Sequence, residues 1–317
     1  SKYLNKSLKQ IHMNIRNFDV VIGKFGGNAL KDANAFKALP GIVDEEMTAQ
    51  SNVLVVSATG STTRELDKVF KQYENRNKKE AIDLLDGILY THEEICWTLF
   101  PEDNTLAIDE IRKSIKCTAE YISGNYPLNE KKEQAHAKIL SLGEVLSWHI
   151  VSAYLVYNGI ENFKLDSREV VKTIGEKYTN AIVDIPQTLQ KISNTFSSYE
   201  YLPRYIVCQG FIGSKATSNT TTLGYEGSDY SASVYAACFG GYLKFFKEFA
   251  YHDLDPDIYP NAEHLESVNI DDLTRDVNRT DKKPILHRLT LEVMKEFKIS
   301  GEIISHNNLS KRTKIVF

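Results

Sequence analysis

The sequence lacks the features that mark several common classes of protein. Its four cysteines are scattered and form no C-x-x-C pair, which argues against a zinc site or a disulfide framework and predicts reduced thiols. No apolar run approaches the length of a membrane span, and no charged start leads into an apolar signal core. The net charge of −4 gives no electrostatic reason to expect nucleic acid or a membrane partner. We therefore expect a cytoplasmic protein.

Several familiar catalytic motifs are also missing. Neither the G-x-x-x-x-G-K-[ST] loop nor the G-x-G-x-x-G loop of protein kinases occurs, and no Ser–His–Asp arrangement is visible. The run His92-Glu93-Glu94 resembles part of a metalloprotease helix, but no second histidine stands at the required spacing. We therefore interpret this run as helix surface and predict no metal-binding residues.

What is present indicates a globular α/β protein. The 317 residues are 42% hydrophobic and 25% charged, which is enough apolar sequence for a large core. Short apolar runs predict five strands, at 18–22, 52–57, 160–165, 205–207 and 242–249, with closing strands at 299–305 and 314–317. Residues 77–157 contain no convincing strand and are predicted to be mostly helical, as are 32–47, although Pro40-Gly41 interrupts that segment. This alternation predicts a mostly parallel sheet with helices on both faces.

Polar clusters follow the predicted strands at their carboxyl ends. They include Lys24 after the first strand, Ser61 and its neighbours after the second, and Lys247 near the end of the fifth. Glu144 stands between apolar neighbours in a predicted helix. A lone glutamate of this kind usually lies on the surface, and the alternative interpretation is that it lines a pocket. Because ligands collect at the carboxyl ends of parallel strands, the clusters predict one active site. Lysines, backbone donors and a carboxylate are the groups that phosphoryl transfer needs.

The stretch 208–240 combines most of these signals. Residues 205–207 read as a buried strand, and 220–223 as the second arm of a hairpin with a polar tip at 214–219. A helix is predicted from Tyr230 to Phe239, with Ser228 as its N-cap and Asp229 in its first turn. A helix start flanked by glycines is a favourable place for a phosphate group.

At these residues the chain resembles the catalytic domain of aspartokinases, in the amino acid kinase superfamily. The matching segments are KFGG at 24–27, SATGSTTREL at 57–66, SLGEVLS at 141–147, LDSREVVKT at 165–173 and QGFIG…TTTLGYEGSDYS at 209–231. The resemblance implies a three-layer α/β/α sandwich. It also implies the transfer of the ATP γ-phosphate to the side-chain carboxylate of L-aspartate with Mg²⁺, the first step of lysine, threonine and methionine biosynthesis.

The resemblance also implies an organisation of the chain. Residues 1–17 would be an N-terminal extension and 18–317 an amino acid kinase catalytic domain. Members of the family continue into ACT domains that sense lysine or threonine, and we expect none in this sequence. The expected partners are ATP and a small amino acid, and a homodimer is left open because dimers are common among such kinases.

Roles for single residues follow from the resemblance. Those implied to bind the nucleotide are Lys24, Gly26, Gly27, Ser228, Lys247 and Glu248. Those implied to bind the amino acid are Ser57, Thr63, Glu144, Arg168 and Tyr225. Lys24 would stabilise the transferring phosphoryl group, Asp229 would orient that lysine, and Glu144 would pair with the substrate ammonium.

Two departures from the family leave alternatives open. Family members have an arginine after TTTLG that clamps a substrate carboxylate, and here the residue is Tyr225. A phenol cannot replace a bidentate guanidinium, so Arg168 or Arg204 takes that role or the substrate differs. The stretch 248–256 lacks the glycine found in the family beside the nucleotide. The alternatives are a kinase for a related amino acid and a non-catalytic paralogue that binds a nucleotide or a partner.

Overall fold

The computed structural model describes residues 19–102, 105–124, 131–224, 226–256, 258–259, 261–279 and 283–317. The expected extension at 1–17 and the substituted Tyr225 both lie outside the described residues. The first half of the chain forms β1 (Val20–Phe25), the 3₁₀ helix η1 (Gly27–Leu30), α2 (Ala33–Glu46), β2 (Ser51–Val56), α3 (Thr62–Glu74), α4 (Lys78–Leu99), α5 (Thr105–Ser123), α6 (Lys132–Leu140) and α7 (Leu142–Tyr157). The second half forms β3 (Phe163–Leu165), α8 (Ser167–Val170), β4 (Thr173–Ile174), β5 (Ile182–Val183), α9 (Ile185–Thr195), β6 (Tyr205–Gln209), β7 (Ile212–Ser214), β8 (Thr220–Thr222), α10 (Gly227–Phe239), β9 (Tyr242–Lys247), β10 (Ser267–Asn269), α11 (Ile270–Asp276), α12 (Arg288–Phe297), β11 (Gly301–Ser305) and β12 (Asn308–Val316).

An eight-stranded sheet stands at the centre in the order β10-β12-β11-β9-β1-β2-β6-β3. Neighbouring strands run parallel except at the β11–β12 pair, which is antiparallel. The five main predicted strands correspond to β1, β2, β3, β6 and β9. The predicted mostly parallel sheet is therefore confirmed.

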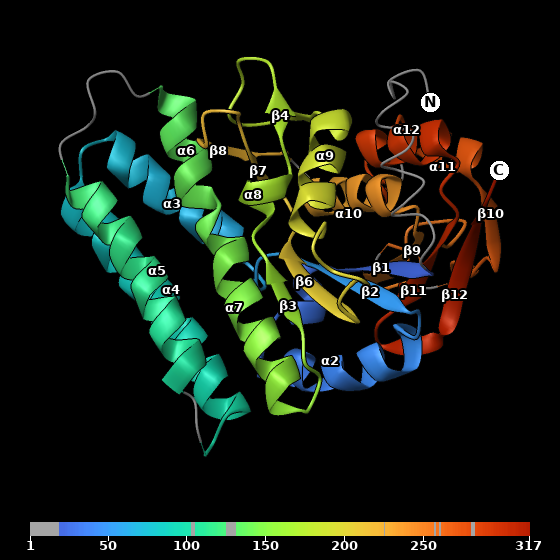
Figure 1. The fold of residues 1–317 in the computed structure, drawn as a ribbon, viewed down its shortest axis with the longest axis horizontal. Coiled ribbons are helices and arrows are strands. Elements are labelled where there is room, and N and C mark those ends of the chain that lie inside the picture. The colour runs from blue at the N-terminus through green and yellow to red at the C-terminus, as the bar shows by residue number, and fades with distance from the viewer. Residues whose placement is uncertain are drawn as a thin grey trace.

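Both faces of this sheet are covered by helices, and alternate residues along each strand supply the two cores. In β2, Leu54 and Val56 belong to the core on one face, whereas Val53 and Val55 belong to the core on the other. The first core is completed by apolar side chains of α2 to α5 and α7, and the second by those of α9, α10 and α12. Figure 1 shows α2 and α7 on one side of the strands, with α10 and α12 on the other. The result is the predicted three-layer sandwich.

The segment Lys132–Tyr157 is long and apolar enough to cross a membrane by length and composition alone, which the sequence analysis did not anticipate. However, 89% of its most apolar window is buried inside the protein. It is divided into α6 and α7, and α7 packs against β2 and β6. Such burial is typical of a core helix.

Some local predictions are wrong, and packing explains why. The helix α2 runs through Pro40 without interruption, because Phe36, Leu39 and Val43 hold it in the buried core. His92 is fully buried rather than on a helix surface, and its Nδ1 contacts the carbonyl of Ile88 at 2.7 Å. The helix α9 was not predicted at all.

The close approach of β6 to α10 depends on Gly210. A Cβ atom at this position would stand 2.6 Å from Cβ and 2.9 Å from Cα of Ser228, so backbone as well as side chain would have to move. We expect Gly210→Ala to lower the free energy of unfolding by about 1–3 kcal/mol, as overpacking does. Gly87→Ala is the matched control, because Gly87 lies inside α4 with no atom within 4 Å of the added methyl group. That variant should gain about 0.5–1 kcal/mol from helix propensity. Urea denaturation of both variants measures the difference, and equal stabilities would contradict the close approach.

Candidate active site

The candidate site lies at the carboxyl ends of β1 and β9. These two strands are neighbours in the sheet, although β2 follows β1 in the chain and lies on its other side. The strand order therefore reverses at β1: the chain continues from β1 to β2 on one side, and β9 later pairs with β1 on the other side. Such a reversal opens a crevice at the carboxyl ends of the strands. β1 delivers Lys24 there and β9 delivers Lys247.

A buried carboxylate joins the two lysines. Oδ1 of Asp229 lies 2.7 Å from Nζ of Lys24, and its Oδ2 accepts a hydrogen bond of 2.5 Å from Nζ of Lys247. Asp229 is fully buried in the first turn of α10, and Lys24 is only 4% exposed. Burial opposes ionisation of Asp229, but the two ammonium groups outweigh it and hold the pKa of this carboxyl below its ordinary value. For Lys247, burial works against the charge, and Asp229 and Glu226 raise the pKa above the ordinary value.

The start of α10 differs from the prediction. Ser228 lies inside the first turn of the helix, and the N-cap position is occupied by Glu226 with a left-handed backbone (φ 54°). The side chain of Glu226 makes no capping hydrogen bond to this helix start. Oε2 of Glu226 lies 3.5 Å from Nζ of Lys247, so Glu226 joins the ionic group. The sequence analysis predicted no role for Glu226. The only indication in the sequence was its position between Gly224 and Gly227.

The loop after β1 packs closely against the loop after β2. A Cβ atom on Gly27 would stand 3.2 Å from the carbonyl oxygen of Ala58, and one on Gly26 would stand 3.2 Å from Nζ of Lys24. A side chain at Gly27 would therefore push the loops apart. Asn28 follows, and its Nδ2 donates a hydrogen bond of 2.8 Å to Oε2 of Glu248, which ties the loop to the end of β9.

A cavity of about 340 Å³ opens beside this ionic group. Its lining comes from the β1 loop, the start of α10, the end of β9 with the segment after it, the segment before α12 and the turn between β11 and β12. The lining residues are Lys24, Gly26, Gly27, Asn28, Ala29, Glu226, Phe246, Lys247, Glu248, Phe249, Ala250, Tyr251, His252, Leu254, Asp255, Pro256, Lys283, Pro284, Ile285 and His306. The structure thus places five of the six residues predicted for the nucleotide on one cavity, and Ser228 is the one that is not among the lining residues. It has the size and the cationic donors expected of a phosphate-bearing ligand site.

Glu144 is buried next to this region, in the first turn of α7. Its Oε1 accepts a hydrogen bond of 3.2 Å from the backbone N–H of Ala58, and no described group pairs with its Oε2. Burial raises the pKa of Glu144 to about 8, although the Ala58 hydrogen bond and the charge of Lys24 oppose the rise. Oγ1 of Thr59 is likewise buried without a partner among the described residues. Orphaned polar atoms of this kind indicate a ligand that completes the site.

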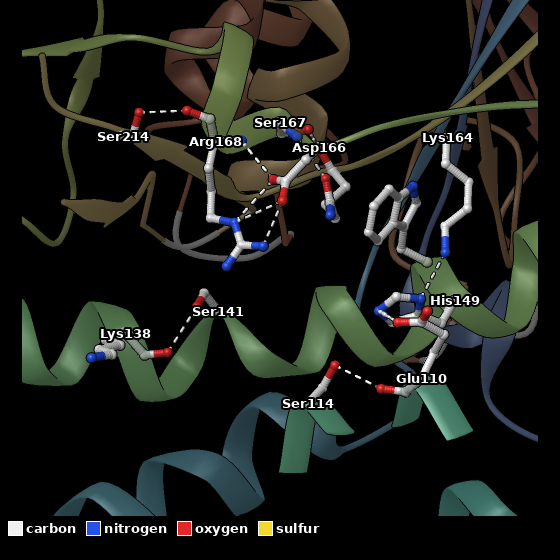
Figure 2. Close-up of polar contacts among 12 residues, drawn as sticks. Glu110, Ser114, Lys138, Ser141, His149, Lys164, Asp166, Ser167, Arg168 and Ser214 are labelled. Atoms are coloured by element: carbon white, nitrogen blue, oxygen red, sulfur yellow. Dashed lines mark hydrogen bonds and ion pairs between the residues drawn. The ribbon is translucent and has the colours of Figure 1, made fainter. Parts of the chain in front are cut away.

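Of the other residues predicted for the amino acid, Ser57, Thr63 and Arg168 have different surroundings, and Tyr225 lies outside the described residues. The carbonyl of Ser57 accepts a hydrogen bond of 2.6 Å from Oγ of Ser147, and Thr63 lies half-buried in the first turn of α3. The guanidinium of Arg168 is held by both oxygens of Asp166 through Nε and Nη2. Figure 2 shows it extending from α8 toward the start of α7 near Ser141. Nη1 of Arg168 has no hydrogen-bond partner in the described part of the chain.

Comparisons with known proteins place the chain in a family. The sequence model of the amino acid kinase family matches residues 19–305. A bifunctional aspartokinase/homoserine dehydrogenase of Buchnera aphidicola is 27% identical over 292 residues, 90% of this chain and 35% of the relative. An aspartokinase of Chlamydia trachomatis is 25% identical over 293 residues, 92% of this chain and 63% of the relative. The chain therefore spans less than two thirds of the length of either relative.

Solved structures show the same fold. Escherichia coli aspartokinase III in complex with aspartate and ADP superposes with a TM-score of 0.78 at 21% identity, over 94% of this chain and 65% of that one. Aspartate kinase of Clostridium acetobutylicum gives a TM-score of 0.72 at 20% identity, over 94% of this chain and 62% of that one.

Proposed function

Because the chain belongs to the amino acid kinase family, we propose that it transfers the γ-phosphoryl group of ATP to the side-chain carboxylate of L-aspartate. The observation that carries the proposal is the buried Lys24–Asp229–Lys247 group on the wall of the 340 Å³ cavity. The relatives that match most of this chain are named aspartokinases, which supports aspartate as the acceptor.

The geometry suits an in-line transfer between two ionised partners. The acceptor carboxylate is already ionised at neutral pH and needs no general base. Lys24 and Lys247 supply two fixed positive charges for the phosphate oxygens, and Asp229 holds both ammonium groups in place without reorganisation. Gly26 and Gly27 let the backbone come close to the ligand, since neither carries a side chain.

Magnesium fits this scheme as a companion of the nucleotide. No cluster of three metal-ligating side chains exists among the residues that the structure describes. Both oxygens of Asp229 are engaged by lysines, whereas Glu226 and Glu248 line the cavity and could reach a cation. Mg²⁺ commonly binds through one or two carboxylates and the substrate phosphates, and there it would neutralise phosphate charge.

We assign Glu144 to the substrate ammonium, and this makes a pH prediction. With a pKa of about 8, the unliganded carboxyl is largely protonated at pH 6–7 and must lose its proton to pair with an ammonium group. The KM for the amino acid should therefore fall by up to about tenfold per unit as pH rises from 6 toward 8. In Glu144→Gln the KM should be higher and nearly independent of pH over this window, whereas Glu161→Gln, at an exposed position, should behave like wild type. A wild-type KM that rises with pH would contradict the assignment.

A coupled ADP-release assay over a panel of acidic amino acids tests the proposed function. Turnover that depends on L-aspartate supports it. Turnover on another amino acid alone would favour a related kinase, the alternative suggested by Tyr225. Nucleotide binding without turnover on any member of the panel would identify a non-catalytic paralogue.

A further inference from the structure

A second cavity, of about 370 Å³, lies on the far side of α7 from the sheet centre, between α5, α7 and the edge strand β3. It shares no lining residue with the cavity beside Lys24. Its lining residues are Phe100, Leu106, Ala107, Glu110, His149, Ser152, Ala153, Val156, Tyr157 and Lys164. Figure 2 shows Lys164 of β3 reaching toward His149 on α7, whereas Arg168 of α8 lies at the left of the view.

The polar end of this cavity presents a cation with spare bonding capacity. Nζ of Lys164 lies 2.8 Å from Nδ1 of His149 and 4.4 Å from the centroid of the Trp148 ring. One ammonium N–H is used by the imidazole and the π-face occupies a second direction, which leaves a third N–H for a ligand. Within the described parts of the chain no carboxylate lies within ion-pair distance of Lys164. Glu110 lines the same cavity and attracts the ammonium group only at longer range, so the nearest bonding positions around Lys164 are left for a ligand.

His149 is held neutral and adds a second donor. An ammonium group can only donate, so Nδ1 of His149 accepts from Lys164 and the ring proton stays on Nε2. Burial, together with the charges of Lys164 and Arg168, lowers the pKa of His149 to about 3, so the ring is neutral and Lys164 is the cation of this pair. Nε2 lies 3.9 Å from Oε2 of Glu110, too far for a direct hydrogen bond. Glu110 thus stands at the rim as a separate acceptor.

The opposite end of the cavity is apolar and open. Phe100 and Ala153 line it, and Leu106, Val156 and Tyr157 are 80%, 43% and 47% exposed. Large apolar side chains exposed around a concavity with a few convergent polar groups are typical of a small-molecule site.

We propose that this cavity binds a small organic carboxylate with an apolar chain. The carboxylate pairs with Lys164, and the chain lies against Phe100, Val156 and Tyr157. The same chemistry is offered by a simple branched monocarboxylic acid and by an α-amino acid with the same side chain. In the second case the ammonium group pairs with Glu110.

Calorimetric titration with 4-methylpentanoate, L-leucine and the uncharged 4-methylpentanamide tests the proposal. We expect saturable binding of at least one of the two acids, with the amide at least tenfold weaker. Lys164→Met keeps the apolar stem and removes the charge, so it should weaken binding of the acid at least tenfold. Lys116→Met is the matched control on α5, with its side chain 75% exposed, and should leave binding unchanged. The melting temperature of each variant checks that the fold persists.

Glu110→Gln distinguishes an α-amino acid from a simple monocarboxylic acid as the ligand of this cavity. If L-leucine binds more tightly than 4-methylpentanoate and this substitution removes the difference, the site takes an α-amino acid. If 4-methylpentanoate binds the wild type at least as tightly as L-leucine, and the substitution leaves or improves its binding, the site takes a simple acid. The proposal is overturned if neither acid binds saturably, if the amide binds as well as the acids, or if the folded Lys164→Met variant binds as well as wild type.

Discussion

Lys24→Ala is expected to lower kcat by about 10³-fold while the protein keeps its fold. The lysine provides one of the two fixed charges that face the cavity, and removing a single preorganised donor to a transition state typically costs about 10²–10³ in kcat. Asp229 remains paired with Lys247 in this variant, so its buried charge is not left alone. The coupled ADP-release assay measures the loss, and circular dichroism with urea denaturation measures the fold.

The control for this experiment is Lys37→Ala. Lys37 lies exposed on α2, so its removal changes the net charge by the same amount without touching the cavity. We expect kcat within about twofold of wild type, as for a surface substitution. Undiminished turnover in Lys24→Ala would remove this lysine from the mechanism.

Asp229→Asn is expected to affect both stability and activity. It leaves the buried Lys24 and the half-buried Lys247 without their shared carboxylate, and breaking a buried ion pair from one side typically costs about 3–5 kcal/mol. Because the pKa of Asp229 is lowered in the folded protein, its contribution is present above the unfolded value near 4 and is lost as pH falls through the folded pKa. The difference between variant and wild type should therefore be largest near neutral pH and shrink in acid.

Asp271→Asn is the comparison for Asp229→Asn. Asp271 pairs with Lys295 at 2.6 Å, but its side chain is 69% exposed, so solvent screens the pair and its removal should cost little stability. Urea denaturation of both variants at pH 7 gives the two costs. Should the two substitutions cost the same, the ionic group at the cavity would have no special electrostatic role.

Much of the fold and part of the site could be predicted because they depend on local patterns. Apolar runs such as the one in β2 mark buried strands, and parallel strands bring their carboxyl ends to one edge. That rule predicts that Lys24 and Lys247 lie close together, although they are more than two hundred residues apart in the sequence. The helix α9 was missed although its start carried a signal. Asp184 caps it, and Gln187 returns a hydrogen bond to the Asp184 side chain.

The rest depends on contacts that no local pattern contains. The left-handed conformation of Glu226, which displaces Ser228 from the cap position, follows from how the α10 start meets the end of β9. The burial of His92 depends on helix packing that places this face inward. The cavity at Lys164 exists because the edge strand β3 meets α7, which precedes it directly in the chain, and α5, which lies further upstream.

Trapping of the product with hydroxylamine tests the central claim most directly. An acyl phosphate reacts with hydroxylamine to give a hydroxamate and inorganic phosphate, so the assay detects phosphorylation of a carboxylate rather than ATP hydrolysis. We predict hydroxamate that requires both ATP and L-aspartate and that disappears in Lys24→Ala. Folded protein that binds ATP but forms no hydroxamate with L-aspartate would contradict the account.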